Sequence, residues 1–255
     1  MSAPVFLAEA GTLDGFGPGS AYVLDGAEAR HAGVVQRRRA GERIDVADGA
    51  GVRLECVIAS VEPGRLELDV LGRLDEPAHP VRLVLAQALA KGDRDEMAVE
   101  AATEVGVDEV VPWQADRSVV VWRGERTAKS RARWLATVRE ATKQSRRARL
   151  PQVAHAVDTA GLVARTRTVV GGGGAVLVLD AAGSVPLGAA SLPDGAAPAE
   201  VVVVVGPEGG IAERELTALA DAGAQLTRLG PTVLRTSTAG PVALGVLAQR
   251  LGRWA

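Results

Sequence analysis

Hydrophobic and polar residues alternate along residues 44–71, and this pattern predicts short β-strands. Apolar side chains take every second position over residues 44–46, 52–58 and 66–70. The segments Asp48-Gly49 and Glu62-Pro63-Gly64, which are typical of turns, separate these runs. Short strands joined by tight turns favour a small antiparallel β-barrel.

Residues 75–80 interrupt the pattern with two prolines, two acids and no apolar periodicity. Such a segment is typical of a linker between domains. We therefore predict an N-terminal β-barrel domain over residues 1–74 and a C-terminal domain over residues 81–255.

Beyond the linker, apolar strands alternate with helical patterns. Strands are predicted at residues 81–85, 110–111 and 176–179, and the valine run at 201–205 is typical of a strand buried on both faces of a parallel sheet. The last helix is predicted over residues 242–251. This alternation predicts an α/β domain with helices on both faces of a mainly parallel sheet.

The first helix of the C-terminal domain has a recognisable start. Asp93 and Glu96 have the spacing of a capping pair, and Met97, Ala101 and Val105 then fall on one helical face. We expect that face to pack inward.

Composition excludes several classes of protein. The chain has 255 residues, of which 47% are hydrophobic and 3% aromatic, and it has a formal net charge of −2. The single cysteine, Cys56, excludes an internal disulfide and a Cys-rich zinc site and fits a reducing cytoplasm. No apolar run approaches the length of a membrane span, and residues 1–10 lack the features of a secretory signal. We expect a cytoplasmic protein without a metal or a membrane partner.

Positive charge is concentrated in two segments. Residues 123–149 hold ten basic residues and two acids, a local charge of +8, and residues 30–43 hold five basic residues and one acid, a local charge of +4. Two such clusters on an acidic remainder favour binding of a polyanion such as RNA. The alternative is a solvated helix face.

The loop Gly206-Pro207-Glu208-Gly209-Gly210 follows the valine strand directly. Ligands of parallel sheets bind at the carboxyl ends of the strands, which is where this loop lies. The loop matches neither a dinucleotide fingerprint nor a P-loop, and Glu208 would repel a phosphate. A ligand with hydroxyls and a positive charge fits better; the alternative is a tight turn with an exposed glutamate.

Residues 229–239 combine one arginine with several hydroxyl residues before the last helix. As helix caps, Thr236, Ser237 and Thr238 are redundant. A cation at Arg235, just before a helix N-terminus, opposes the helix dipole unless it has another partner. This local conflict predicts a functional position.

Together these segments resemble a known family. The pairing of Gly206-Pro207-Glu208-Gly209-Gly210 with Leu229-Gly230 and Leu234-Arg235-Thr236-Ser237-Thr238-Ala239 is similar to the RsmE family of SPOUT-class 16S rRNA (uracil-N3)-methyltransferases. Other matching segments, in the same order, are His31, Arg37, Gly41-Glu42, Asp48-Gly49, Lys91-Gly92-Asp93, residues 102–107, Val111-Pro112, Arg117-Ser118, Arg133-Trp134, Glu140-Ala141 and Gln144-Ser145. The resemblance covers essentially the whole chain. Ser237 departs from it, because the family often has glutamate there.

The resemblance implies a PUA-like RNA-binding barrel followed by a SPOUT domain tied in a trefoil knot. It also implies S-adenosyl-L-methionine as cofactor, a homodimer, and 3-methyluridine in 16S ribosomal RNA or the small ribosomal subunit as product. The implied cofactor-binding residues are Gly206, Pro207, Glu208, Gly209, Gly210, Leu229, Gly230, Leu234, Thr236, Ser237, Thr238 and Ala239. The expected RNA-binding residues are Arg30, His31, Arg37, Arg38, Arg39, Lys91, Arg117, Gln144, Arg146 and Arg147.

Methyl transfer from a sulfonium needs no metal, but uracil N3 must lose its proton. Arg235 is the candidate catalytic residue, because a nearby cation stabilises the uracil anion and lowers the pKa of N3. The alternative for Arg235 is a contact with RNA phosphate. Two rival functions are a SPOUT ribose 2'-O-methyltransferase acting on tRNA or rRNA, and a non-catalytic RNA-binding protein.

Overall fold

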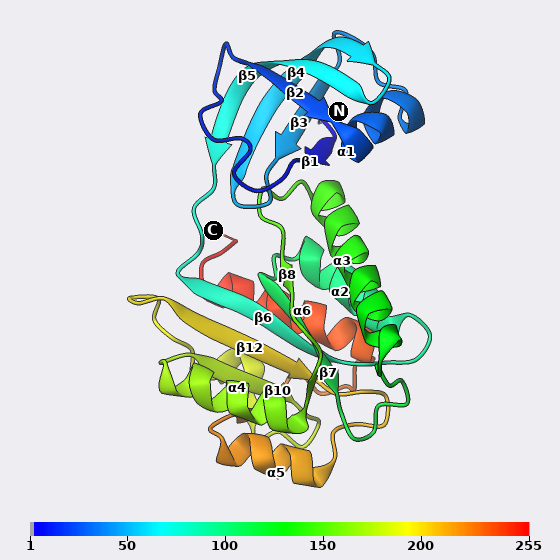
Figure 1. The fold of residues 1–255 in the computed structure, drawn as a ribbon. Helices are drawn as coiled ribbons and strands as arrows, with labels where there is room; N and C mark the ends of the chain where they lie inside the picture. Colours follow the sequence, from blue (N-terminus) through cyan, green and yellow to red (C-terminus); the bar gives the residue numbers. More distant parts are fainter. Residues whose placement is uncertain (1–2, 255) are drawn as a thin grey trace. The chain divides into compact units, whose positions relative to one another are not determined.

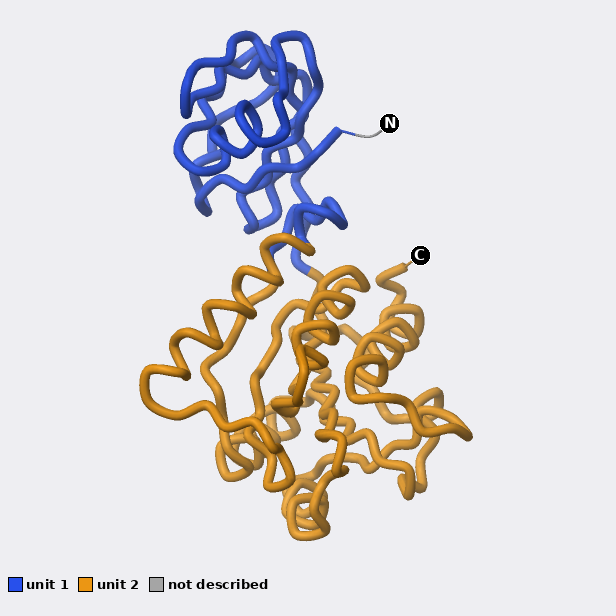
Figure 2. The backbone as a smooth tube through the Cα atoms, turned by 90° about the vertical axis from the view of Figure 1, so that its right-hand side faces the viewer, with its two compact units in different colours: residues 1–78, 142–150 blue, residues 79–141, 151–255 orange. Residues whose placement is uncertain are grey.

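The structure is a computed structural model that describes residues 3–254, and it divides into two compact units (Figure 2). Unit 1 comprises residues 1–78 and 142–150, and unit 2 comprises residues 79–141 and 151–255. The predicted boundaries placed residues 142–150 in the C-terminal domain, whereas the structure packs them with unit 1. Hydrogen bonds explain the difference: Arg149 Nη2 donates to Glu76 O at 2.6 Å, and Leu150 N donates to Gly49 O at 2.9 Å.

Unit 1 is built on a five-stranded sheet (Figure 1). Its strands, in sheet order, are β1 (Val5–Leu7), β3 (Arg43–Ala47), β4 (Val52–Glu62), β5 (Arg65–Asp75) and β2 (Ala21–Asp25). The predicted strands correspond to β3, β4 and β5, which pair antiparallel. The pairing of β1 with β3 is parallel, which the antiparallel prediction missed. The helix α1 (Gly26–Arg30) and a π-helical turn (His31–Val35) follow β2.

Alternation along the strands of unit 1 produces its core. Ile44 faces Cys56 and Val46 faces Leu54 across β3 and β4, and all four side chains are fully buried. Burial raises the pKa of the Cys56 thiol to about 12, so it stays protonated and acts as a small apolar side chain. The predicted turn at Asp48 is confirmed, since its Oδ1 accepts hydrogen bonds from the N–H groups of residues 50, 51 and 52.

Unit 2 contains an eight-stranded sheet in which every pairing among the described residues is parallel. Its strands, in sheet order, are β11 (Val185–Pro186), β13 (Gln225–Arg228), β10 (Ala175–Leu179), β12 (Ala199–Val205), β6 (Val81–Ala88), β7 (Glu109–Gln114) and β8 (Gln152–Val153), with β9 (Val157–Asp158) also paired to β7. The valine run is confirmed as a buried central strand, β12.

Helices cover both faces of this sheet (Figure 1). The helices of unit 2 are α2 (Arg94–Glu104), α3 (Glu125–Ser145, which continues into unit 1), α4 (Thr159–Gly171), α5 (Glu213–Asp221) and α6 (Thr236–Arg250), with a 3-10 turn at Leu187–Ala189. α4 and α5 pack on each other over one face, where Val202 and Val204 join their buried side chains. α2 and α6 pack together over the other face.

Two details of the helices differ from the prediction. Met97 is 56% exposed, while Ala98, Val99 and Ala102 are buried, because small residues fit the close packing of α2 against β6 and α6. Asp93 precedes α2 but makes no capping hydrogen bond, since its backbone is left-handed with φ of 60° and not extended as at an ordinary N-cap.

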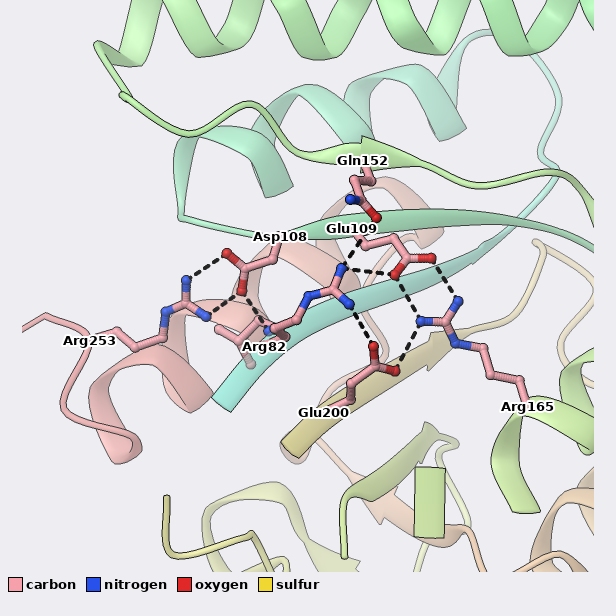
Figure 3. A network of polar contacts seen from close by, with 8 residues as sticks. Arg82, Asp108, Glu109, Gln152, Arg165, Glu200 and Arg253 are labelled. Carbon is pink, nitrogen blue, oxygen red and sulfur yellow. Dashed lines mark hydrogen bonds and ion pairs between the residues drawn. The ribbon is translucent and has the colours of Figure 1, made fainter. Parts of the chain in front are cut away.

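An ionic network joins the amino ends of three neighbouring strands (Figure 3). Arg165 of α4 donates to both oxygens of Glu109 at 2.7 and 2.9 Å and to Glu200 at 3.1 Å. Arg82 bridges the same two carboxylates at 3.2 and 2.8 Å. Burial of Glu109 would raise its pKa, but the hydrogen bonds and charges of Arg165 and Arg82 outweigh burial and hold the pKa below its ordinary value. The network ties β6, β7 and β12 together at the end of the sheet opposite the predicted site.

Candidate functional site

The carboxyl ends of β10 and β12 open into a cavity of about 510 Å³ in unit 2. It is lined by residues 179–181, 205–208, 210–211, 233–236 and 239, together with Arg94. A smaller cavity of about 160 Å³ adjoins it and is lined by residues 179–181, 228–234 and 239. Two loops that are distant in sequence, residues 206–211 and 229–239, therefore build one site.

The two loops are joined by the side chain of Thr236. Its Oγ1 donates to Gly206 O at 2.8 Å and accepts from Gln87 Nε2 at 2.8 Å. Gln87 is fully buried near the end of β6, so the junction lies inside the protein. α6 begins at Thr236 and not at residue 242 as predicted, and Thr236 bridges two loops and does not cap the helix.

The glycines of residues 206–210 have different roles. A Cβ at Gly206 would lie 2.5 Å from Ile211 Cγ1, and Gly210 has a positive φ of 74° that disfavours other residues. Gly209 does not line either cavity, because it faces Arg117, whose Nη1 donates to Gly209 O at 3.0 Å. The tight loop thus depends on Gly206 and Gly210. Gly209 contacts Arg117 on the side of the loop that faces away from the cavities.

The implied cofactor-binding residues fall into three groups. Gly206, Pro207, Glu208, Gly210, Leu234, Thr236 and Ala239 line the larger cavity. Leu229 and Gly230 line the smaller one. Gly209, Ser237 and Thr238 line neither, because Gly209 packs on Arg117 and the other two lie in the first turn of α6 beyond Thr236.

Glu208 is paired with a cation. Its Oε1 accepts from Arg94 Nη1 at 2.7 Å and from Lys91 N at 3.3 Å. Partial burial would raise the pKa of Glu208, but hydrogen bonds from its own backbone N–H, Arg94 and Lys91 hold it below the ordinary value. Glu208 is thus ionised and neutralised by Arg94, a residue that the sequence analysis did not identify as part of the site.

Arg235 lies just before the helix α6, where its charge opposes the helix dipole as the sequence predicted. It is the residue before α6, it is exposed, and it lines the larger cavity. Within residues 3–254 the structure gives its guanidinium no hydrogen bond and no ion pair. Its charge is therefore free for a ligand.

Asp180, Gln87 and Arg94 are site residues that sequence reasoning missed. Asp180 lines both cavities, but a lone aspartate after a strand has no distinctive spacing. Arg94 directly follows the motif Lys91-Gly92-Asp93, and its position next to this motif could have indicated that it belongs to the site.

The expected RNA-binding residues lie in both units. Arg38 and Arg146 line a cavity of about 680 Å³ in unit 1, together with Arg43 and Arg53. The other expected residues of unit 1 are exposed (Arg30, Arg37, Arg39 and Gln144) or half-buried (His31 and Arg147). The two that belong to unit 2, Lys91 and Arg117, lie next to the loop of residues 206–210.

Part of the basic segment of residues 123–149 serves the fold. Arg131 donates to Val153 O and Ala154 O, Arg133 pairs with Glu96, and Lys143 pairs with Glu28 at 3.5 Å. These cations already have partners within the protein, so the expectation that the whole segment faces phosphates is too broad. Arg146 keeps an exposed guanidinium.

The described part of the chain contains neither a candidate metal site nor a candidate membrane-spanning helix. No group of three or more His, Cys, Asp or Glu residues there is arranged to hold a metal ion. No helix among the same residues is long and apolar enough to cross a membrane.

Comparison with known proteins gives consistent matches. The family model of an RNA methyltransferase domain matches residues 77–248. The ribosomal RNA small subunit methyltransferase E of Mycobacterium bovis is 46% identical over 241 residues, covering 92% of this chain and 89% of that protein, and that of Bacillus subtilis is 30% identical over 231 residues, covering 89% of each. The crystal structure of a ribosomal RNA small subunit methyltransferase E from Neisseria gonorrhoeae bound to S-adenosyl methionine has a TM-score of 0.83 and 26% identity and covers 98% of both chains.

Proposed function

This chain belongs to the RNA methyltransferase family of the ribosomal RNA small subunit methyltransferase E proteins, and we propose that it methylates N3 of a uridine in 16S ribosomal RNA. The chain is an S-adenosylmethionine-dependent RNA methyltransferase, as its relatives are named and as the cofactor-bound relative indicates. The observation that carries the proposal is the convergence of residues 206–211 and 229–239 on one cavity at the carboxyl ends of β10 and β12.

The cavity fits S-adenosylmethionine. Its larger part, about 510 Å³, is in the range of small-molecule sites, and a part of about 160 Å³ adjoins it. Their lining is mostly apolar or glycine, with two carboxylates, Asp180 and Glu208. Apolar surface and free backbone groups suit an adenine ring, and carboxylates suit hydroxyls and positive charge. The cofactor supplies an electrophilic methyl group when bound. We propose that residues 206–208, 210, 229–230, 234, 236 and 239 hold it.

Arg235 is the proposed catalytic residue. It brings a cation without a carboxylate partner among residues 3–254 to the wall of the larger cavity. A guanidinium beside the uracil stabilises the anion that forms when N3 loses its proton, so it lowers the pKa of N3 and raises the fraction of N3 that is deprotonated and able to accept the methyl group at neutral pH. Thr236 and Gln87 fix the start of α6 and therefore the backbone of Arg235.

Unit 1 is the proposed RNA-binding domain, with a PUA-like barrel. Support comes from its five-stranded sheet and from the exposed residues Arg37, Arg39 and Arg146, of which Arg146 lines the 680 Å³ cavity. The other three arginines of that cavity are paired with carboxylates. We further propose that the C-terminal domain is tied in a trefoil knot, that two chains form a homodimer, and that the enzyme acts in the cytoplasm, where its ribosomal substrate would be.

The test is nucleoside analysis of ribosomal RNA by mass spectrometry. Cells that lack the gene should have no 3-methyluridine in 16S RNA, and the wild-type gene should restore it. The purified protein should form the same product from S-adenosylmethionine and small-subunit RNA. A 2'-O-methylated product would instead support the ribose methyltransferase, and an unchanged nucleoside profile would support a non-catalytic RNA-binding protein.

A further inference from the structure

The two carboxylates of the unit 2 cavity differ in their electrostatic partners. Glu208 is neutralised by Arg94 at 2.7 Å. Asp180 accepts one hydrogen bond, from Ala182 N to its Oδ1 at 2.8 Å, and across residues 3–254 the structure gives it no ion pair. Asp180 is therefore the cavity carboxylate without an ion-pair partner among the described residues, although Arg235 lines the larger part and Arg228 the smaller one.

The position of Asp180 suits contact with a ligand. It follows Leu179, the last residue of β10, at the carboxyl end of the parallel sheet, where ligands of such sheets bind. It lines both the 510 Å³ and the 160 Å³ cavity, so it lies where the two parts of the site meet. A half-buried carboxylate in this place is stabilised when the ligand brings a cation.

We infer that the Asp180 carboxylate binds the α-ammonium group of the methionine part of S-adenosylmethionine. This inference rests on the proposed function, and it transfers to Asp180 the charge-recognising role that the sequence analysis gave to Glu208. Glu208 already has Arg94 as its partner, so it attracts a second cation less strongly.

The chemistry of the reaction favours the ammonium over the sulfonium as the partner. The positive charge of the sulfonium disappears as the methyl group leaves, so a carboxylate in contact with it would stabilise the ground state more than the transition state and slow the transfer. The ammonium keeps its charge throughout. An ion pair with it holds the cofactor without opposing the reaction.

The experiment measures ligand affinity of the full chain by calorimetry, with Asp180→Asn as the variant. Asparagine keeps Oδ1 for the Ala182 N–H and removes the charge. The three ligands are S-adenosylmethionine, S-adenosylhomocysteine, which keeps the ammonium but has a neutral sulfur, and methylthioadenosine, which has neither charge. Loss of one charge-assisted hydrogen bond should weaken binding of the first two by about 10- to 100-fold and leave methylthioadenosine unchanged.

Asp194→Asn is the matched control. Asp194 Oδ1 accepts from Ala196 N at 2.9 Å, a hydrogen bond with the same two-residue spacing as that of Asp180, and Asp194 lines neither cavity. All three affinities should stay at their wild-type values in this variant.

Each result that contradicts the inference has a different meaning. Equal affinities in wild type and Asp180→Asn would overturn the inference. A loss for S-adenosylmethionine alone would make Asp180 a sulfonium partner, and an equal loss for methylthioadenosine would assign it to the ribose hydroxyls; either result overturns the inference. A wild-type protein that binds none of the ligands would refute the proposed function itself.

A second measurement needs no variant. The wild-type protein should bind the analogue of S-adenosylhomocysteine that lacks the amino group about 10- to 100-fold more weakly than S-adenosylhomocysteine. Equal affinity for the two ligands would overturn the inference even if Asp180→Asn failed to fold.

Discussion

Thr236 Oγ1 donates a hydrogen bond to Gly206 O at 2.8 Å and thereby joins two loops that are 30 residues apart in the sequence. The same hydroxyl accepts from Gln87 Nε2, so the end of β6, the loop after β12 and the start of α6 meet at one oxygen. This bond fixes the larger cavity between the two loops, because each contributes part of its wall.

Thr236→Val should therefore weaken cofactor binding and lower stability together. The valine leaves Gly206 O without its partner and removes one of the two hydrogen bonds of the buried Gln87 Nε2, which keeps Ala88 O as its acceptor. The loss costs about 1–3 kcal/mol of unfolding free energy. Denaturant unfolding and calorimetry with S-adenosylmethionine measure the two effects. Thr168→Val is the control, because that hydroxyl bonds only to Ala164 O on the exposed face of α4. Wild-type affinity in Thr236→Val would show that the junction does not shape the site.

Gly206→Ala should reduce cofactor affinity strongly, whereas Gly209→Ala should be tolerated. The methyl group at residue 206 would lie 2.5 Å from Ile211 Cγ1 and distort the wall of the cavity, but at residue 209 the nearest atom is Arg117 Cβ at 3.4 Å. Calorimetric titration of both variants with S-adenosylmethionine makes the comparison. Equal affinities would contradict the different roles of the two glycines.

Arg235→Ala should lower the methylation rate by about 10²-fold at neutral pH, the effect of losing one group that stabilises the transition state. Single-turnover kinetics across a pH series provides the measurement. The deficit should shrink as pH rises, because hydroxide removes the N3 proton without help, and Arg235→Lys should be intermediate. Arg167→Ala, on the exposed side of α4, should keep the wild-type rate. A defect that is constant with pH, or one confined to RNA affinity, would make Arg235 a positioning residue.

Arg146→Gln should flatten the salt dependence of RNA binding, while Arg131→Gln should not. The guanidinium of Arg146 is exposed, and loss of one phosphate contact should reduce the slope of log K against log salt by about 0.7 to 0.9. Arg131 already donates to Val153 O and Ala154 O, so its loss should lower stability and leave the slope unchanged. Filter binding over a range of salt concentrations tests both. If Arg131→Gln flattened the salt dependence and Arg146→Gln did not, the assignment of Arg146 to RNA binding and of Arg131 to the fold would be refuted.

Glu109→Gln should lower the unfolding free energy by about 3 kcal/mol at pH 7, because it leaves the charge of Arg165 partly uncompensated among buried groups. The folded-state pKa of Glu109 is lowered, so its stabilisation is complete above the ordinary carboxyl pKa and is lost as pH falls through the lowered value. The difference in unfolding free energy between the wild type and Glu109→Gln should therefore become smaller at acid pH.

Denaturant unfolding at pH 7 and at pH 4 tests this dependence, with Glu100→Gln on the exposed side of α2 as the control. Cofactor affinity should be unchanged, since the network lies at the amino ends of the strands and the cavity at the carboxyl ends. A difference that widens in acid would contradict the lowered pKa.

The sequence alone was sufficient for features that depend on local pattern. Alternation of side chains predicted β3, β4 and β5, and a continuous apolar run predicted β12 as a buried strand, because burial on one or both faces of a sheet imposes these periods directly. The loop of residues 206–210 was located for the same reason: it follows a strand whose carboxyl end could be recognised. Arg235 was identified because it conflicts with its own local structure.

Tertiary structure alone decided which groups meet. The association of residues 142–150 with unit 1 rests on hydrogen bonds from Arg149 and Leu150 to residues that precede them by 73 and 101 positions, and no periodicity records such contacts. Glu208 pairs with Arg94 across 114 residues of sequence. The carboxylate of Glu208 is therefore already neutralised, although the sequence suggested that it was free to bind a cationic ligand. Asp180 became prominent for the converse reason, because the folded chain brings it to the cavity and, within residues 3–254, gives it no ion pair.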